Sequence, residues 1–194
     1  MSSNIVEEFF DFVAPKWDEM ESHSIDEKKY LLNKVNINEG DKVLDVACGT
    51  GVITGLIHSY SNTNVVGIDI SNNMINIAKE KYKNDSWASF YHNDFLDFDE
   101  TNKYDVAIIY NAFPHFLNSE LVVNKLTKIL NKNGKFAILH SLSRSELEKH
   151  HEHCTNVSRV LQNPIVEAKL FEKDFDILEA SETEHTFVLI GRLK

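Results

Sequence analysis

An acid and a series of small residues stand together in residues 43–51, which read Val-Leu-Asp-Val-Ala-Cys-Gly-Thr-Gly. Asp45 lies inside an apolar stretch, where a carboxylate is costly unless it finds hydrogen-bond donors. Ala47, Gly49 and Gly51 alternate after it, and such small residues let a backbone turn approach a ligand closely. This spacing predicts a strand that ends in a ligand-binding turn, which then leads into a helix.

A second acid, Asp69, ends the next apolar stretch, residues 64–69. A carboxylate has two oxygens that it can offer to a diol such as a ribose. A glycine turn after one strand and an acid after the next are therefore the arrangement expected of a nucleoside-binding site. These residues indicate an enzyme with a nucleotide-like cofactor.

Alternating strands and helices must position these residues. Apolar runs predict strands at 42–48, 64–69, 87–92, 104–110 and 135–141. Helical periodicity predicts helices at 51–60, 71–83 and 118–132, with a turn or helix stop at 131–134. This alternation predicts an α/β fold with a doubly wound, mostly parallel sheet. Residues 175–180 and 186–190 are too close for a crossover helix, so we expect them to pair as an antiparallel hairpin.

Composition limits the classes of function. The 194 residues suit one domain over residues 1–194. With 20 Lys and Arg against 30 Asp and Glu, the formal net charge is −10, so we expect neither nucleic acid nor a membrane surface as a partner. We see no signal peptide, and Cys48 and Cys154 form no disulfide framework. We therefore expect a cytoplasmic monomer or homodimer.

Two segments lie outside the alternation of strands and helices. Residues 3–13 carry an apolar helical stripe, and Trp17 follows it. Residues 142–163 begin with a capping-box sequence, Ser-Arg-Ser-Glu at 143–146. Open α/β sheets bind their ligands at the carboxyl ends of the strands. We therefore predict helical lids at 1–35 and 142–163, with Trp17 facing the substrate.

The glycine spacing also resembles that of a known family. Ala47-x-Gly49-x-Gly51, led by Asp45, differs from the G-x-G-x-x-G dinucleotide fingerprint. It resembles the first motif of class I S-adenosylmethionine (SAM)-dependent methyltransferases, especially the small-molecule branch of ubiquinone and menaquinone biosynthesis. The resemblance covers about residues 40–141 and, more loosely, the terminal hairpin. It implies SAM as the cofactor and a Rossmann-like seven-stranded sheet with a reversed last strand.

The resemblance implies roles for the matching positions. Asp45 would hold the loop and reach the cofactor's ammonium, while Gly49 and Gly51 would let the turn approach its methionine and ribose. Asp69 would accept the ribose hydroxyls; the alternative is a cap for the helix at 71–83. The cofactor set implied in full is Asp45, Ala47, Gly49, Thr50, Gly51, Asp69, Ile70, Met74, Asp94, Phe95 and Asn111.

The adenine side of this set comes from residues after the second and third strands. Ile70 and Met74 would pack against the adenine. Asp94 would accept hydrogen bonds from its amino group, and Phe95 would pack on the ring. The alternative for Asp94 is a solvated acidic loop, because Asp97, Asp99 and Glu100 follow it.

Histidines supply the candidate catalytic groups. His115 follows the fourth strand, where the resemblance implies that the reactive methyl lies, and its ordinary pKa near neutrality suits a general base. The alternative is a loop histidine that orders the lid. His140 ends the fifth strand and is a second catalytic candidate, while Arg144 would contact a substrate carboxylate or phosphate. Residues 110–116 lack the Asn/Asp-Pro-Pro-aromatic motif of nucleic-acid methyltransferases, which favours a small-molecule acceptor.

A cluster at the second lid leaves further functions open. His150, His153 and Cys154 can share one helix face, where imidazole and thiolate could bind a soft metal. The simpler alternative is a polar lid helix without a metal. We expect a SAM-dependent methyltransferase for a small molecule; the alternatives are a metal- or metalloid-linked methyltransferase and a non-catalytic SAM-binding sensor or assembly protein.

Overall fold

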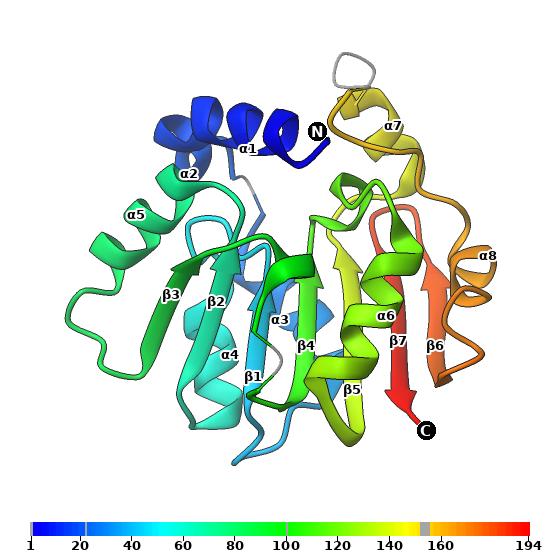
Figure 1. Ribbon diagram of the computed structural model, residues 1–194. Coiled ribbons are helices and arrows are strands. Elements are labelled where there is room, and N and C mark those ends of the chain that lie inside the picture. The colour runs from blue at the N-terminus through cyan, green and yellow to red at the C-terminus, as the bar shows by residue number, and fades with distance from the viewer. Residues whose placement is uncertain (1, 22, 100, 152–155) are drawn as a thin grey trace.

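A seven-stranded sheet forms the centre of the molecule in the computed structural model, which describes residues 2–21, 23–99, 101–151 and 156–194 (Figure 1). The strands are β1 (Val43–Val46), β2 (Val65–Asp69), β3 (Ala88–His92), β4 (Tyr104–Tyr110), β5 (Leu130–His140), β6 (Phe175–Glu182) and β7 (Phe187–Leu193). They lie in the order β3-β2-β1-β4-β5-β7-β6. Strand β7 runs antiparallel to β5 and β6, whereas the other neighbours pair in parallel. The predicted mostly parallel sheet and its terminal hairpin are confirmed.

Helices cover both faces of this sheet. They are α1 (Ser2–Val13), α2 (Trp17–Met20), α3 (Ile25–Val35), α4 (Thr54–Ser61), α5 (Asn72–Lys81), α6 (Ser119–Ile129), α7 (Arg144–His151) and α8 (Pro164–Ala168), with short 3₁₀ turns η1 (Ala14–Lys16), η2 (Phe95–Asp97) and η3 (Phe113–His115). Helices α3 and α4 pack on one face, and α6 and α8 pack on the other. The predicted doubly wound architecture is thus present.

The central strand β4 shows why these residues form this sheet. Ile109 belongs to the apolar cluster that contains Leu126 of α6, while Ile108 belongs to the cluster that contains Leu32 of α3. All four side chains are almost completely buried. A strand that is covered on both faces needs apolar residues at successive positions, which is typical of parallel sheets.

The turn predicted at residues 131–134 differs from the structure. Helix α6 ends at Ile129, as expected of a helix stop, but residues 131–134 belong to the first part of β5. Asn133 has a φ of 63°, and the pairing of β5 with β4 shifts register between Tyr104 and Val106. The local irregularity that the sequence indicated is therefore accommodated within the strand.

The predicted N-terminal lid range divides into two parts. Helices α1 and α2 lie across the carboxyl ends of the strands, whereas α3 packs against the sheet through Leu31, Leu32 and Val35 (Figure 1). Helix α7 lies at the same end of the sheet as α1. The capping box before α7 is confirmed, because the Ser143 amide donates to Glu146 Oε2 at 2.8 Å and the Glu146 amide donates to Ser143 Oγ at 3.4 Å. Within the described residues, no helix has both the length and the apolar character needed to cross a membrane.

Candidate active site

A cavity opens at the carboxyl ends of β1, β2, β3 and β4, below α1 and α2. It contains about 1370 Å³ of empty space, part of which is open to solvent. The predicted site residues that line it are Trp17, Asp45, Ala47, Gly49, Asp69, Ile70, Met74, Asp94, Phe95, Asn111 and His115. Strand β1 has β2 on one side and β4 on the other, so the cavity lies at the point where the strand order reverses. Doubly wound sheets bind their ligands there.

Asp45 is a buried carboxyl group in β1, one residue before the strand ends. Its Oδ2 accepts a hydrogen bond from Thr54 Oγ1 at 2.7 Å. Burial raises the pKa of Asp45 to about 7, and the nearby charge of Asp69 adds to the rise. A carboxyl group with a raised pKa is stabilised as a carboxylate when a cation binds beside it. Asp45 is therefore suited to a positively charged ligand.

Asp69 connects the loops that follow β1 and β2. Its Oδ2 accepts from the amide of Gly49 and its Oδ1 accepts from the amide of Ser71, both at 2.8 Å. A carboxylate oxygen can accept two hydrogen bonds, and each oxygen of Asp69 accepts one from these amides, so both can still accept from a ligand's hydroxyls. Burial raises the pKa of Asp69 to about 6. Ser71 is the N-cap of α5 and accepts from the Met74 amide at 3.1 Å, so the capping alternative for Asp69 is wrong.

The small residues of the glycine loop, residues 47–51, have different roles: some line the cavity and one packs against the core. Ala47, Gly49 and Gly51 have φ values of 52°, 54° and 77°, all in the left-handed region that favours glycine. Gly49 lines the cavity, but Gly51 does not. A Cβ atom at Gly51 would lie 2.8 Å from Cε2 of Tyr82, whose hydroxyl donates to the Gly51 carbonyl at 2.8 Å. The absence of a side chain at Gly51 thus allows Tyr82 to pack against the loop. The predicted approach of Gly51 to the cofactor is not seen, because Gly51 does not line the cavity.

Thr50 is likewise turned away from the cavity. Its side chain is fully buried, and its Oγ1 donates to Asp18 Oδ1 at 2.5 Å. Lys81 of α5 donates to the same Oγ1 at 3.2 Å and lies 2.7 Å from Asp18 Oδ2. Thr50, predicted as a cofactor contact, instead ties the loop to α2 and α5.

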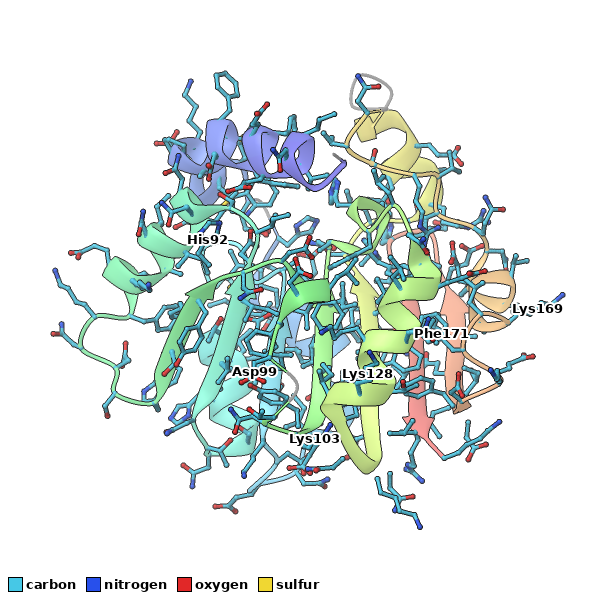
Figure 2. The ribbon with its side chains drawn as sticks, viewed as in Figure 1. His92, Asp99, Lys103, Lys128, Lys169 and Phe171 are labelled. Carbon is cyan, nitrogen blue, oxygen red and sulfur yellow. The ribbon has the colours of Figure 1, made fainter. Side chains whose placement is uncertain are left out.

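The loop after β3 places Asp94 and Phe95 at the cavity. Asp94 caps η2 by accepting from the Leu96 amide at 2.9 Å, and Phe95 is buried. Figure 2 shows His92 at the carboxyl end of β3, near α1, whereas Asp99 lies toward the opposite end of the sheet. Asp94 therefore lines the cavity, whereas Asp97 and Asp99, which follow it in the sequence, do not.

His115 lies in η3 at the wall of the cavity. Its Nδ1 is 2.9 Å from the carbonyl oxygen of Val157, and its ring contacts Phe10 edge-on at 4.8 Å between centroids. A carbonyl only accepts, so Nδ1 carries the proton and Nε2 holds the lone pair in the neutral ring. His115 thus orders the segment after α7 and also faces the cavity, which keeps both of its predicted roles open.

His140 and Arg144 are placed elsewhere. His140 is fully buried at the end of β5, where its ring contacts Phe187 edge-on at 5.7 Å. Arg144 forms a bidentate ion pair with Glu182 of β6, with Nε at 2.6 Å from Oε2 and Nη2 at 2.9 Å from Oε1. Neither residue lines the cavity. The predicted contact of Arg144 with a substrate carboxylate is therefore replaced by its ion pair with Glu182.

Three acids of the N-terminal segment contact the loops after β1 and β2 and the end of β3, which the sequence did not indicate. Asp18 binds Thr50 after β1, as described above. Asp11 Oδ1 accepts from Ser71 Oγ at 2.6 Å after β2. Glu7 lies 3.2 Å from Nε2 of His92, at the end of β3. These contacts hold α1 and α2 over the cavity.

The structure also adds Glu21 and Tyr110 to the lining of the cavity. Neither has a motif around it that could have identified it. Asn111 directs its side chain to the residue that follows β5, because its Nδ2 donates to Ser141 Oγ at 2.7 Å and its Oδ1 accepts from the Ser141 amide at 2.9 Å. The parts of the chain that the structure describes contain no group of three or more His, Cys, Asp or Glu residues suited to a metal ion. His153 and Cys154 lie outside the described residues, so the metal site built on them and His150 stays a prediction.

The reversed β7 and the acid-lined cavity across β1 to β4 define a class I SAM-dependent methyltransferase. Residues 37–184 match the family model for a methyltransferase domain, and the chain belongs to this family. Two buried carboxyl groups with raised pKa values, Asp45 and Asp69, fit a cofactor that carries a positive charge and two ribose hydroxyls.

Similar proteins agree with this assignment. Sterol 24-C-methyltransferase ERG6 of Saccharomyces cerevisiae is 35% identical over 115 residues, which are 56% of this chain and 30% of that protein. Demethylmenaquinone methyltransferase of Chlamydia caviae is 29% identical over 150 residues, 73% of this chain and 63% of that protein. The N-methyltransferase NodS from Bradyrhizobium japonicum WM9, solved with S-adenosylhomocysteine (SAH), has a TM-score of 0.75 at 13% identity over 97% of this chain and 98% of that one. The chain spans about a third of the length of the first curated relatives it matches.

Proposed function

We propose that this chain transfers the methyl group of SAM to a small-molecule acceptor and releases SAH. The observation that carries this proposal is the single cavity that Asp69, Asp94 and His115 all line. Sterol and demethylmenaquinone methyltransferases among the relatives support a small acceptor. Bound SAM supplies a methyl group on a sulfonium sulfur, which is already a strong electrophile. The chain's own task is therefore mainly to align the acceptor and exclude water.

We infer that the N-terminal segment serves as a lid during this reaction. Val6, Phe10 and Trp17 line the cavity from above. The contacts of Glu7, Asp11 and Asp18 with the cofactor loops support a closed position for this lid. An acceptor has to fit below these side chains, which favours a small molecule over a folded macromolecule.

His115 is the general base that we propose for acceptors with a hydroxyl group. As the S–CH₃ bond breaks and the O–CH₃ bond forms, the hydroxyl proton passes to Nε2 of His115. The Val157 carbonyl keeps the Nδ1 proton in place and so presents the Nε2 lone pair. An amine acceptor that is already uncharged has less need of this base before transfer.

SAH formation tests this proposal. Purified protein is incubated with SAM and a panel of phenols, thiols, amines and quinols, and SAH is measured. We expect SAH formation with at least one acceptor, and its loss in Asp69→Ala. Binding of SAM without turnover on any acceptor would favour the sensor alternative. A protein that binds neither SAM nor SAH would refute the proposal.

A further inference from the structure

A short segment, residues 157–159, contacts η3 through two hydrogen bonds. The Arg159 amide donates to the carbonyl oxygen of Pro114 at 2.9 Å. Two residues earlier, the Val157 carbonyl accepts from Nδ1 of His115 at 2.9 Å. The hydrogen bond that one ring nitrogen of a histidine makes decides which nitrogen carries the proton. The position of the 157–159 segment therefore controls the tautomer of His115.

The 157–159 segment has no regular secondary structure to hold it in place. The described residues 156–163 form neither helix nor strand. Figure 1 shows this stretch running from α7, at the carboxyl ends of the strands, to α8. Irregular backbone lacks the repeated hydrogen bonds of a helix or strand, so a fixed position requires other contacts.

A buried ion pair between Arg159 and Glu167 supplies such contacts. Nη1 of Arg159 donates to Oε1 of Glu167 at 2.6 Å, and Nη2 donates to Oε2 at 3.1 Å. Glu167 belongs to α8, is 2% exposed, and also accepts from the Gln162 amide at 2.8 Å. The guanidinium carbon of Arg159 lies 4.6 Å from the centre of the Phe113 ring, at the start of η3. Because a bidentate pair fixes direction as well as distance, it joins α8, the 157–159 segment and η3.

We propose that Arg159 and Glu167 are positioning residues for His115, which hold the Val157 carbonyl at its Nδ1 and so keep the proton off Nε2. The value of this arrangement for catalysis rests on the proposed function, because Nε2 receives the hydroxyl proton there. Neither Arg159 nor Glu167 lines the cavity, so their effect on the reaction passes through η3. Desolvation offsets much of the attraction in a buried ion pair, so fixed geometry is its main contribution here.

The tautomer of His115 tests this assignment without a methyl acceptor. Long-range nitrogen NMR spectra of protein labelled with ¹⁵N-histidine distinguish a proton on Nδ1 from one on Nε2. The spectra are recorded at pH 8, where an ordinary histidine is neutral, and the signal lost in His115→Asn identifies this residue. We expect His115 of the wild type to carry its proton mainly on Nδ1.

Two variants separate positioning from stability. Arg159→Lys keeps the charge but cannot form the bidentate pair. The double variant Arg159→Met with Glu167→Met removes both buried charges, a replacement that often leaves stability unchanged. We expect both variants to raise the fraction of His115 with the proton on Nε2 at least threefold. Arg144→Lys is the matched control and should leave the tautomer unchanged, because Arg144 forms the same kind of pair with Glu182 of the edge strand β6.

Kinetics give a second measurement, with any hydroxyl acceptor that the SAH assay identifies. We expect kcat to fall at least tenfold in both Arg159 variants, while KM for the acceptor stays within twofold of the wild type. A wild type with its proton on Nε2, an unchanged tautomer in both variants, or an equal change in Arg144→Lys would each overturn the assignment. If the tautomer shifts as expected but the wild type forms no SAH, the positioning of His115 stands and the proposed function fails.

Discussion

Replacing Asp45 with Asn should stabilise the ligand-free protein at alkaline pH while it weakens the binding of SAM. Burial raises the pKa of Asp45 to about 7 in the folded protein, against an ordinary value of 3.8. The folded state then binds the proton more tightly than the unfolded state, so the free energy of unfolding falls as pH rises from about 4 to about 7. At about 1.36 kcal/mol per pKa unit, the full loss is about 4 kcal/mol. Asn keeps an oxygen for the Thr54 hydroxyl without the buried charge.

Urea unfolding of the ligand-free wild type and Asp45→Asn at pH 5 and pH 8 measures this effect. We expect the wild type to lose stability between the two pH values and the variant to lose less of it, by about 1–4 kcal/mol. Calorimetry at pH 8 should show a larger loss of affinity for SAM than for SAH, because only SAM carries the sulfonium charge. Asp105→Asn is the control, since Asp105 accepts from the Lys42 amide at the other end of the sheet. A variant that is equally destabilised at both pH values would refute the argument from burial.

Three other substitutions test the site. His115→Asn should lower kcat for hydroxyl acceptors by about 10²–10⁴-fold, with SAH affinity in calorimetry within twofold of the wild type; an unchanged kcat would rule out the general base. Asp18→Asn should weaken the lid contact and speed both SAH release in stopped-flow measurements and proteolysis of residues 1–21 severalfold; equal rates would show that this contact does not hold the lid. Gly51→Ala should destabilise the protein by about 1–3 kcal/mol in urea unfolding, because of its φ of 77° and the contact with Tyr82. Gly40→Ala is the control, because Gly40 has a φ of 94° but a Cβ atom there would meet no atom within 4 Å. This variant has the backbone strain without the contact, so it should destabilise the protein less than Gly51→Ala.

The sequence predicted the parts of the fold that depend on local pattern. The apolar run that forms β4 alternates between two cores, and its pattern is visible in consecutive residues. The short gap before Phe187 leaves an antiparallel hairpin as the available pairing. The sequence also predicted that the loops after β1 and β2 lie at one site, because Gly49 and Asp69 each stand at the end of an apolar run. The hydrogen bond from the Gly49 amide to Asp69 joins these two loops in the structure.

Contacts between distant segments were beyond prediction. Arg144 meets Glu182, which lies 38 residues further along the chain and has no sequence signal that marks it as a partner. Thr50 faces Asp18 because α2 lies beside the loop, and nothing in the spacing of the glycine motif indicates that contact. Tyr110 was equally hidden, since a tyrosine that ends a buried strand is usually part of the core. The acids of the N-terminal segment resemble an ordinary solvated helix face until the loops that they contact are placed in space.

We expect the charge of the site to favour SAM, the substrate form of the cofactor, over SAH, its product form. The acids that line the cavity are Glu21, Asp45, Asp69 and Asp94, and no Lys or Arg of the described residues lines it. Methyl transfer converts the sulfonium into a neutral thioether, so these carboxylates lose one attractive partner after the reaction. A larger affinity for SAM than for SAH follows, and it should shrink at pH 5, where Asp45 and Asp69 are protonated in the free protein. Calorimetry with both ligands at pH 5 and pH 8 checks this ratio, and a ratio that does not change with pH would show that these two carboxyl groups do not sense the sulfonium.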